Sequence, residues 1–247
     1  MNTIKHQVSN SKLSPKEVDV RQMFNDIAPN YDFLNHFLSA GSDKHWRKKT
    51  IKLLRPFQPK QILDIATGTG DLAIEALSLN PEHVTGVDIS EEMLKVALKK
   101  IEGKKIGNMI SLKQAASEDL PFAESTFDAV TVAFGVRNFN DLHKGLEEIF
   151  RVLKNDGVAA ILEFSVPSAF PMKQIYLLYF RHILPLIGKI VSKNKMAYKY
   201  LPETVISFPQ GKEFRGILEK VGFTKNRAKR LSGGICSIYI AEKKSKV

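Results

Sequence analysis

The chain has few of the residues that form disulfides and metal clusters. Its 247 residues include one cysteine, Cys236, and one tryptophan. A single cysteine excludes an intramolecular disulfide and a thiolate metal cluster, and it is typical of a reducing compartment. Because Cys236 lies in an apolar run, its pattern favours a packing role over a nucleophilic one.

Long apolar runs are also missing. The first residues are polar and lack the apolar core of a secretory signal, so we expect a cytoplasmic protein with a disordered segment at 1–16. No apolar stretch reaches the ~20 residues of a membrane-spanning helix. No internal repeat is visible. Residues 17–247 are predicted to form a single domain, because 43% hydrophobic and 26% charged residues is an ordinary globular balance.

Acidic residues are outnumbered. The 26 Asp and Glu stand against 37 Lys and Arg, which gives a formal net charge of +11. Basic residues cluster at 44–49, 189–199, 225–230 and 243–246. Such patches would suit nucleic-acid phosphates or an anionic membrane surface, or they would form a solvated face that keeps the protein soluble. Composition alone leaves these three interpretations open.

Apolar runs alternate with helical periods along most of the chain. We predict strands at 61–66, 84–88, 109–115, 127–134 and 158–164, with helices at 71–79, 91–101 and 142–153. This order is typical of βαβ units in a parallel sheet, and Gly157 is expected to close the turn after the last helix. Two more strands, 223–231 and 235–241, are joined by Ser232-Gly233-Gly234, which indicates a hairpin. The predicted fold class is therefore α/β and Rossmann-like, with a mostly parallel seven-stranded sheet.

Two segments lie outside this minimal fold. A helical N-terminal cap is predicted at 17–58, and an apolar insertion occupies 170–208. We interpret the insertion as a helical lid over an apolar substrate or as an amphipathic segment lying on a membrane, while a helix packed on the sheet is the third possibility. Apolar surface would come from Tyr176, Leu177, Tyr179, Phe180, Leu184 and Ile187, and contacts to anionic headgroups from Lys189, Lys193, Lys195 and Lys199.

A glycine turn joins the first strand to the first helix, with an acid on each side. Gly68 and Gly70 form the turn, Asp64 lies near the end of the strand and Asp71 begins the helix. The pattern resembles a dinucleotide fingerprint, but two carboxylates would repel a pyrophosphate. S-adenosylmethionine has no phosphate and carries a sulfonium and an ammonium group. The sequence therefore predicts S-adenosylmethionine at Asp64, Gly68, Gly70 and Asp71.

Further candidate residues follow the later strands. Asp88 ends the second strand, where an acid can bind both ribose hydroxyls of an adenosine, although the same place would serve NAD. Ser117 and the backbone around Ala116 are expected beside the adenine. The fourth strand ends at Ala133, which we expect to contact the donor. Arg137 and Asn138 come directly after it and are the candidate catalytic residues, because ligands bind beyond the carboxyl ends of parallel strands.

Several segments are similar to the signatures of one known family. They are Tyr31-Asp32-x-Leu34-Asn35-x-x-Leu38-Ser39-x-Gly41 followed by Trp46, Phe134-Gly135-x-Arg137-Asn138, Arg151-Val152-Leu153-Lys154 with Leu162-Glu163-Phe164-Ser165, and Tyr198-x-Tyr200-Leu201 with Ser207-Phe208-Pro209. Over residues 20–241 the chain resembles the ubiquinone/menaquinone-biosynthesis C-methyltransferases, the UbiE/MenG family. Asp43 stands where the family signature usually has histidine, and Ala116 where relatives often carry an acid or asparagine.

The resemblance implies a class I S-adenosylmethionine-dependent C-methyltransferase of the EC 2.1.1 class that requires no metal. It implies donor contacts at Thr69, Asp88, Ala116 and Ser117, and we assign Tyr31, Phe134 and Tyr200 to the substrate. The implied reaction methylates a ring carbon of demethylmenaquinol or of the corresponding benzoquinol. The implied partners are a polyprenyl quinol and the inner face of an anionic membrane. The oligomeric state stays open.

Two rival functions use the same fold. A methyltransferase acting on nucleic acid would explain the charge, but it should carry base-stacking aromatic residues beside the catalytic loop or an added binding module, and the sequence has neither. We therefore expect no nucleic-acid partner. Another small-molecule acceptor, or a binding protein without catalysis, would keep the donor fold and change the chemistry.

Overall fold

The computed structural model describes residues 19–39, 41–179 and 195–244. The predictions for 1–16 and for the middle of the insertion lie outside these ranges. Within them, seven strands form one sheet in the order β3-β2-β1-β4-β5-β7-β6. The strands are β1 Gln61–Ile65, β2 His83–Asp88, β3 Ile110–Gln114, β4 Phe127–Ala133, β5 Leu153–Phe164, β6 Thr224–Leu231 and β7 Cys236–Glu242. Strand β7 runs antiparallel to both of its neighbours, β5 and β6, and the other pairs are parallel, so the predicted sheet and its hairpin are confirmed.

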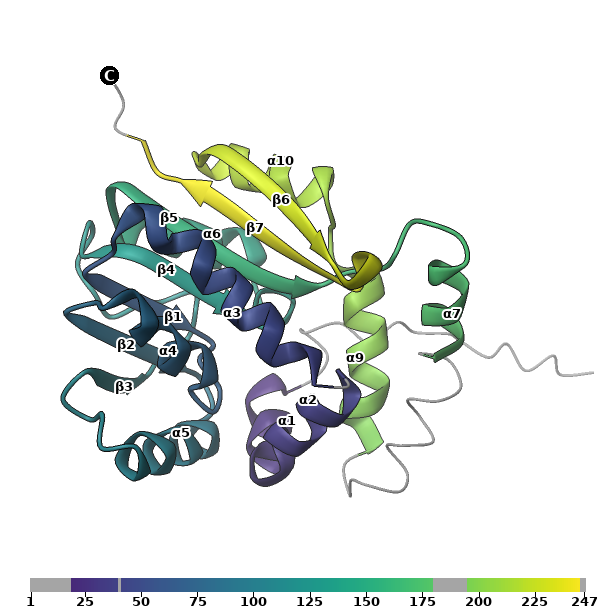
Figure 1. The fold of residues 1–247 in the computed structure, drawn as a ribbon, viewed down its shortest axis with the longest axis horizontal. Coiled ribbons are helices and arrows are strands. Elements are labelled where there is room, and N and C mark those ends of the chain that lie inside the picture. Colours follow the sequence, from purple (N-terminus) through teal and green to yellow (C-terminus); the bar gives the residue numbers. More distant parts are fainter. Residues whose placement is uncertain (1–18, 40, 180–194, 245–247) are drawn as a thin grey trace, which may run out of the picture.

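Helices lie on both faces of the sheet (Figure 1). They are α1 Val20–Ile27, α2 Tyr31–Leu38, α3 Ser42–Leu54, α4 Asp71–Ala76, α5 Glu91–Gly103, α6 Leu142–Val152, α7 Met172–Leu178, α9 Lys195–Ser207 and α10 Lys212–Val221. Apolar side chains of α3, α4 and α5 pack on one face, and those of α6 and α10 pack on the other. The central strands are buried on both faces, which explains why their sequences read as continuous apolar runs.

The largest difference from the prediction is at the start of β5. This strand begins at Leu153 instead of 158, because Leu153 already pairs with Phe127 and the register then shifts before Val158 pairs with Ala129. Asp156 in this irregularity has φ +61°, and a side chain at Gly157 would come within 2.8 Å of the Lys154 carbonyl oxygen. Gly157 therefore lies in a bulge inside the strand and does not close a turn before it.

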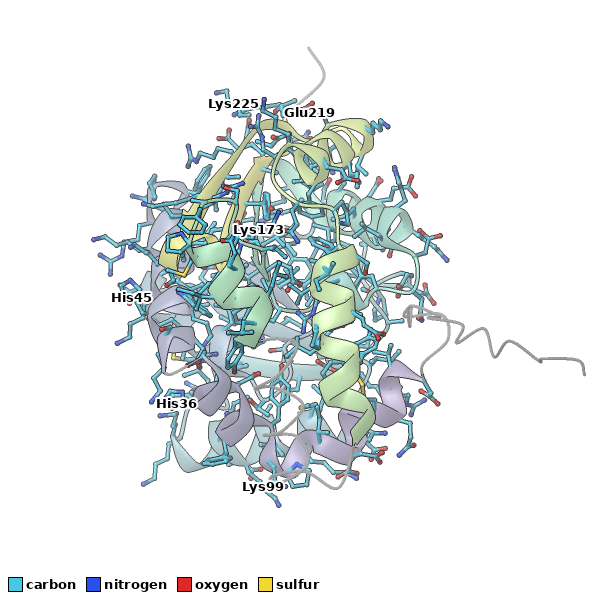
Figure 2. All side chains as sticks on the ribbon, turned by 90° about the vertical axis from the view of Figure 1, so that its right-hand side faces the viewer. His36, His45, Lys99, Lys173, Glu219 and Lys225 are labelled. Carbon is cyan, nitrogen blue, oxygen red and sulfur yellow. The ribbon has the colours of Figure 1, made fainter. Side chains whose placement is uncertain are left out.

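The cap and the described parts of the insertion gather at the carboxyl ends of the parallel strands. Figure 1 shows α1, α2, α7 and α9 at this end of the sheet, and Figure 2 looks onto α7 and α9 from the side. No helix in the described ranges is long and apolar enough to cross a membrane. The arrangement leaves a covered space above the ends of β1, β2 and β4.

Strand β6 is the outer edge of the sheet. Its exposed residues include Lys225, Arg227, Lys229 and Arg230, so one of the basic clusters seen in the sequence forms a row along a free edge. Figure 2 places Lys225 at the top of the molecule and Lys173, at the start of α7, nearer its middle. The other end of the row lies beside the loop before α7, where Arg230 donates to the Ser168 hydroxyl at 2.6 Å.

Candidate active site

A cavity of about 230 Å³ lies between the cap and the strand ends. The cap contributes Val20, Phe24 and Tyr31 to its lining, and the ends of β2 and β4 contribute Asp88 and Ala133. A smaller cavity, lined by residues that include Asp64, Thr69 and Asp71, shares Tyr31 and Ala133 with the larger one. The site thus lies at the topological switch point, where open α/β sheets bind ligands.

The glycine turn has the backbone shape that the sequence predicts. Gly68 and Gly70 have φ angles of +55° and +81°, in the left-handed region where a side chain is strained. Gly68 lines both cavities, so the backbone itself forms part of the wall. Gly70 is the N-cap residue of α4 and is not in the described lining of either cavity. The first glycine is therefore placed for ligand contact and the second for the turn.

Asp88 joins the glycine turn to the end of β2. Its carboxylate is 8% exposed, and its oxygens accept hydrogen bonds from the backbone N–H of Gly68 and Ser90, each at 2.8 Å. Burial raises the pKa of this carboxyl. The residue lines the cavity, and carboxylate oxygens can accept more than one hydrogen bond each. Asp88 is thus fixed and able to accept hydrogen bonds from a diol.

Asp64 is more deeply buried than Asp88. It is 1% exposed, and it accepts hydrogen bonds from the hydroxyls of Thr67 and Thr131, both at 2.6 Å. Burial raises its pKa to about 6. Asp64 lines the smaller cavity and is not in the described lining of the larger one.

Asp71 and Thr69 belong to an ion-pair network. The Asp71 carboxylate lies 2.7 Å from Lys100 Nζ and 3.0 Å from the Arg47 guanidinium, so two cations offset its charge. The Thr69 hydroxyl donates to Asp32 at 2.5 Å and accepts from Lys100 at 3.0 Å. Both residues line the smaller cavity.

The charge that could attract a cationic ligand comes from other acids. Asp19, Asp88 and Glu118 line the larger cavity, and Arg21 is the cation in its described lining. The described lining of the larger cavity therefore carries three acids and one cation, whereas the charge of Asp71 is offset by partners that are distant in sequence.

The segment after β3 lies on the side expected for an adenine. Ala115, Ser117 and Glu118 line the larger cavity, and the Ser117 hydroxyl donates to Glu118 at 2.9 Å. Ala116 is in the same segment, and its carbonyl accepts a hydrogen bond from the backbone of Asp119, but it is not part of the described lining.

The end of β4 holds an unusual backbone conformation. Phe134 has φ +58°, which is rare for a bulky residue, and its carbonyl oxygen accepts hydrogen bonds from Arg137 Nη1 at 2.5 Å and Asn138 Nδ2 at 3.3 Å. Arg137 Nη1 also contacts the carboxylate of Glu163 at 2.6 Å. Phe134 and Asn138 line the larger cavity, whereas Arg137 lies behind them and is not in the described lining.

The assigned substrate residues come from the cap and from α9. Tyr31 lines both cavities. Tyr200 is 2% exposed and packs against Val20 and Met23 of α1, and burial raises its pKa to about 12. Its hydroxyl has no hydrogen-bond partner in the described ranges. Tyr200 thus closes the space between α1 and α9.

Sequence reasoning missed four charged residues of this region. They are Asp32, Arg47, Lys100 and Glu163. Arg47 was counted in a basic surface cluster, yet it is 8% exposed. Glu163 stands at the end of the apolar run of β5, and an acid at such a place is the one signal that could have identified it.

Comparison of sequences finds close relatives along nearly the whole chain. The sequence model of the ubiE/COQ5 methyltransferase family matches residues 12–243. A demethylmenaquinone methyltransferase of Bacteroides fragilis is 48% identical over 92% of this chain and 94% of its own length. A ubiquinone/menaquinone biosynthesis C-methyltransferase UbiE of Geotalea uraniireducens is 44% identical over 94% of this chain and 99% of its own length.

Solved structures share the architecture at much lower identity. A SAM-dependent methyltransferase of Thermotoga maritima superposes with a TM-score of 0.64 at 18% identity, covering 90% of this chain and 99% of that one. One from Aquifex aeolicus gives a TM-score of 0.57 at 21% identity, covering 78% and 89%. These likenesses confirm the predicted fold, that of the class I SAM-dependent methyltransferases.

Proposed function

The chain belongs to the ubiE/COQ5 methyltransferase family, and on this premise we propose that it transfers a methyl group from S-adenosylmethionine to a ring carbon of a polyprenyl quinol. The family resemblance, the enzyme class and the methyl donor inferred from the sequence are thereby confirmed. The names of the relatives favour demethylmenaquinol, with the benzoquinol of the ubiquinone route as the second acceptor.

The larger cavity fits this donor. Its described lining combines a buried diol acceptor, Asp88, with two further acids and one cation, which favours a cationic ligand without phosphates. When bound, S-adenosylmethionine supplies a methyl group whose bond to sulfur breaks as the ring carbon attacks, after which that carbon loses its proton. Asp88 would hold the ribose, Ser117 would lie beside the adenine, and Gly68 would let the backbone approach closely.

The acceptor side is supported by aromatic side chains at the ends of β4 and β5. The rings of Phe134 and Phe164 stack with centroids 4.3 Å apart, and Trp46 meets both edge-on. An ionised quinol hydroxyl makes its ortho carbon nucleophilic, so the protein must hold the ring, exclude water and stabilise the phenolate. We assign the last task to Arg137 and Asn138, directly or through water.

We also propose that the enzyme meets its lipid substrate at a membrane surface. One side of α7 and the loop before it exposes Phe170, Ile175 and Leu178, with exposed fractions of 81%, 57% and 58%. Tyr176, which the sequence analysis placed on this surface, is 6% exposed and packs inward, so that assignment was wrong. Phe180, Leu184 and Ile187, and the lysines 189 and 193, lie outside the described residues.

The decisive experiment is methyl transfer from labelled S-adenosylmethionine to matched naphthoquinols and benzoquinols of equal prenyl length. Product that carries the label on the ring carbon, with no label on RNA or DNA, supports the proposal. Labelled nucleic acid, or no transfer to either quinol, would refute it. The Asp88→Asn variant serves as the control for transfer that depends on the assigned donor site.

A further inference from the structure

We propose that Glu163 is a positioning residue that fixes the Arg137 guanidinium, so that Arg137 Nε–H remains the donor for the oxygen of the methyl acceptor. The inference rests on the proposed function, because that oxygen belongs to the quinol. Its elements are one buried ion pair, one strained backbone segment and a set of buried polar atoms without partners.

Glu163 stands where an acid is costly. It lies at the end of β5, directly after the buried apolar residues of that strand, and it is 0% exposed. Removing a carboxylate from water costs several kcal/mol unless a cation and hydrogen bonds compensate. The end of a strand does not need a buried carboxylate to keep its fold. The residue therefore calls for an explanation from what it contacts.

Its side-chain oxygens contact the segment after β4 and the neighbouring residue of β5. Glu163 Oε1 lies 2.6 Å from Arg137 Nη1 and accepts the backbone N–H of Phe164 at 2.9 Å. Glu163 Oε2 accepts the backbone N–H of Arg137 at 3.3 Å. The carboxylate thus holds Arg137 both by its side chain and by its main chain.

A guanidinium is planar, so fixing one nitrogen between two acceptors orients the others. Arg137 Nη1 is held between Glu163 and the Phe134 carbonyl, and its guanidinium carbon lies 5.4 Å from the centre of the Phe164 ring. Arg137 Nε is buried and has no hydrogen-bond partner in the described part of the chain. Nε–H is therefore an oriented donor for which the described residues supply no acceptor.

Other unpaired atoms lie around this ion pair. Asn138 Oδ1 and the Tyr200 hydroxyl are buried, and neither has a hydrogen-bond partner among the described residues. Asn138 lines the larger cavity. The charges of Arg137 and Glu163 both act on the pKa of the Tyr200 hydroxyl, Arg137 lowering it and Glu163 raising it. Buried polar groups are rarely left unpaired unless a ligand or water completes them. The acceptor oxygen would lie beside Asn138, where Arg137 Nε and the Tyr200 hydroxyl would give the site a polar end.

The negative charge of Glu163 has a second effect. It offsets the charge of Arg137, so the acceptor oxygen meets a directed N–H rather than an unbalanced cation. Without that offset, the cation would lower the pKa of the quinol hydroxyl further and would make the bound phenolate a weaker nucleophile. Loss of Glu163 should therefore change both the rate and the pH dependence.

The test compares Glu163→Gln with Glu148→Gln. Glu148 also pairs with an arginine, Arg151, at 2.6 Å, but lies on α6 away from the cavity lining. We expect Glu163→Gln to lower kcat at least about tenfold, to shift the acid limb of the pH profile to lower pH, and to leave donor Kd unchanged. Glu148→Gln should change neither kcat nor the limb. A wild-type kcat in Glu163→Gln, or a loss that matches a loss of donor binding, would overturn the proposal.

Two further measurements separate positioning from a general structural role. A double-mutant cycle with Arg137→Ala should show that Glu163→Gln adds no further loss when the guanidinium is gone, whereas additive losses would overturn the proposal. The Arg137 Nε–H signal in nitrogen-15 spectra should exchange slowly in the wild type and in Glu148→Gln and should broaden in Glu163→Gln. An unchanged signal would contradict the positioning role of Glu163.

If Glu163→Gln does not fold, Glu163→Asp is the second variant, because it keeps the negative charge. We expect Glu163→Asp to lower kcat and to leave the acid limb of the pH profile as in the wild type; a full wild-type kcat would overturn the proposal. The wild-type rate with quinol tests the proposed function separately.

Discussion

Asp32 on α2 and Lys100 on α5 form an ion pair with 2.6 Å between Oδ2 and Nζ. The same ammonium reaches the hydroxyl of Thr69 and the carboxylate of Asp71 at the glycine turn. A second link joins Asn25 of α1 to the Ser90 hydroxyl at 2.7 Å. Since residues of α1 and Tyr31 line the larger cavity, these contacts hold the cap over this cavity.

Replacing Lys100 with methionine should loosen the cap. The three contacts of the ammonium are lost, but the pair is partly exposed, with 24% and 42% side-chain exposure, so we expect about 1 kcal/mol or less of unfolding free energy. Donor affinity should fall severalfold, and amide exchange in α1 and α2 should speed up. Lys99→Met makes the same charge change at the exposed neighbouring position labelled in Figure 2. Equal effects of the two variants would contradict the role of Lys100.

Asp88→Asn should weaken donor binding with little change in fold. A hydrogen bond to a charged group is worth roughly 1.5–3 kcal/mol, so calorimetry should show about a tenfold or greater rise in Kd. Asp128→Asn is the matched control, because Asp128 also accepts two backbone N–H groups, those of Lys60 and Gln61, at the opposite ends of the strands. Unchanged affinity in a folded Asp88→Asn protein would remove Asp88 from the donor site.

Asp64 should make the stability of the protein depend on pH. Burial raises its pKa from 3.8 to about 6, so between these values the folded state keeps a proton that the unfolded chain has released. Its contribution to the unfolding free energy therefore falls as the pH rises through this window, by about 3 kcal/mol in all. Asp64→Asn removes the ionisable group. Urea titrations at pH 4 and pH 7.5 would give the unfolding free energies of the variant and of the wild type. We expect the variant to gain stability relative to the wild type at the higher pH. An equal difference at both pH values would show that Asp64 does not have this raised pKa.

Gly135→Ala should force apart the ends of β1 and β4. A Cβ atom at Gly135 would lie 2.5 Å from the Cβ of Ala66, a contact that requires the backbone to move. We expect a loss of about 1–3 kcal/mol in unfolding free energy, together with weaker donor binding. Gly216→Ala on α10 is the control, since no atom lies within 4 Å of its added Cβ and helix propensity predicts a gain of about 0.5–1 kcal/mol. Similar changes in both variants would refute the close approach at Gly135.

The exposed side of α7 gives a test of the membrane proposal. Replacing Ile175 and Leu178 with serine should weaken flotation with anionic vesicles about tenfold or more, since each buried aliphatic side chain contributes roughly 1.5–3 kcal/mol. Binding should also fall as salt rises. The melting temperature should stay the same because both side chains are exposed. Leu98→Ser removes a 48% exposed leucine from α5 and should have no effect on flotation. An equal loss in Leu98→Ser would show that the association is not specific to α7.

The sequence predicted the sheet well because its signals are local. Apolar runs and the glycine turn at Gly68 fix where strands and helices begin, and Asp88 is the last residue of its strand. The start of β5 was missed because Leu153 is followed by three polar residues, Lys154 to Asp156, and a bulge separates it from the apolar run that begins at Val158. Alternation of apolar residues carries no information about such an irregularity.

The site was predicted less completely, for a different reason. Arg47 and Lys100 lie on α3 and α5, and nothing in their local sequence shows that both reach Asp71. Arg137 was placed correctly after β4, but its buried partner Glu163 comes from another strand. Long-range ion pairs depend on how elements pack, so they become visible only when the strands and helices are seen together.

The row of lysine and arginine along β6 has a consequence for how copies of the protein meet. A free edge strand offers unpaired N–H and C=O groups to any other strand that can align with it. If two copies joined edge to edge, Arg227 and Lys229 would face their own counterparts at the spacing of paired strands, about 5 Å, where like charges oppose each other. Part of the +11 charge thus ends the sheet at seven strands and discourages its growth into a ribbon of many chains, with no ligand needed to account for it.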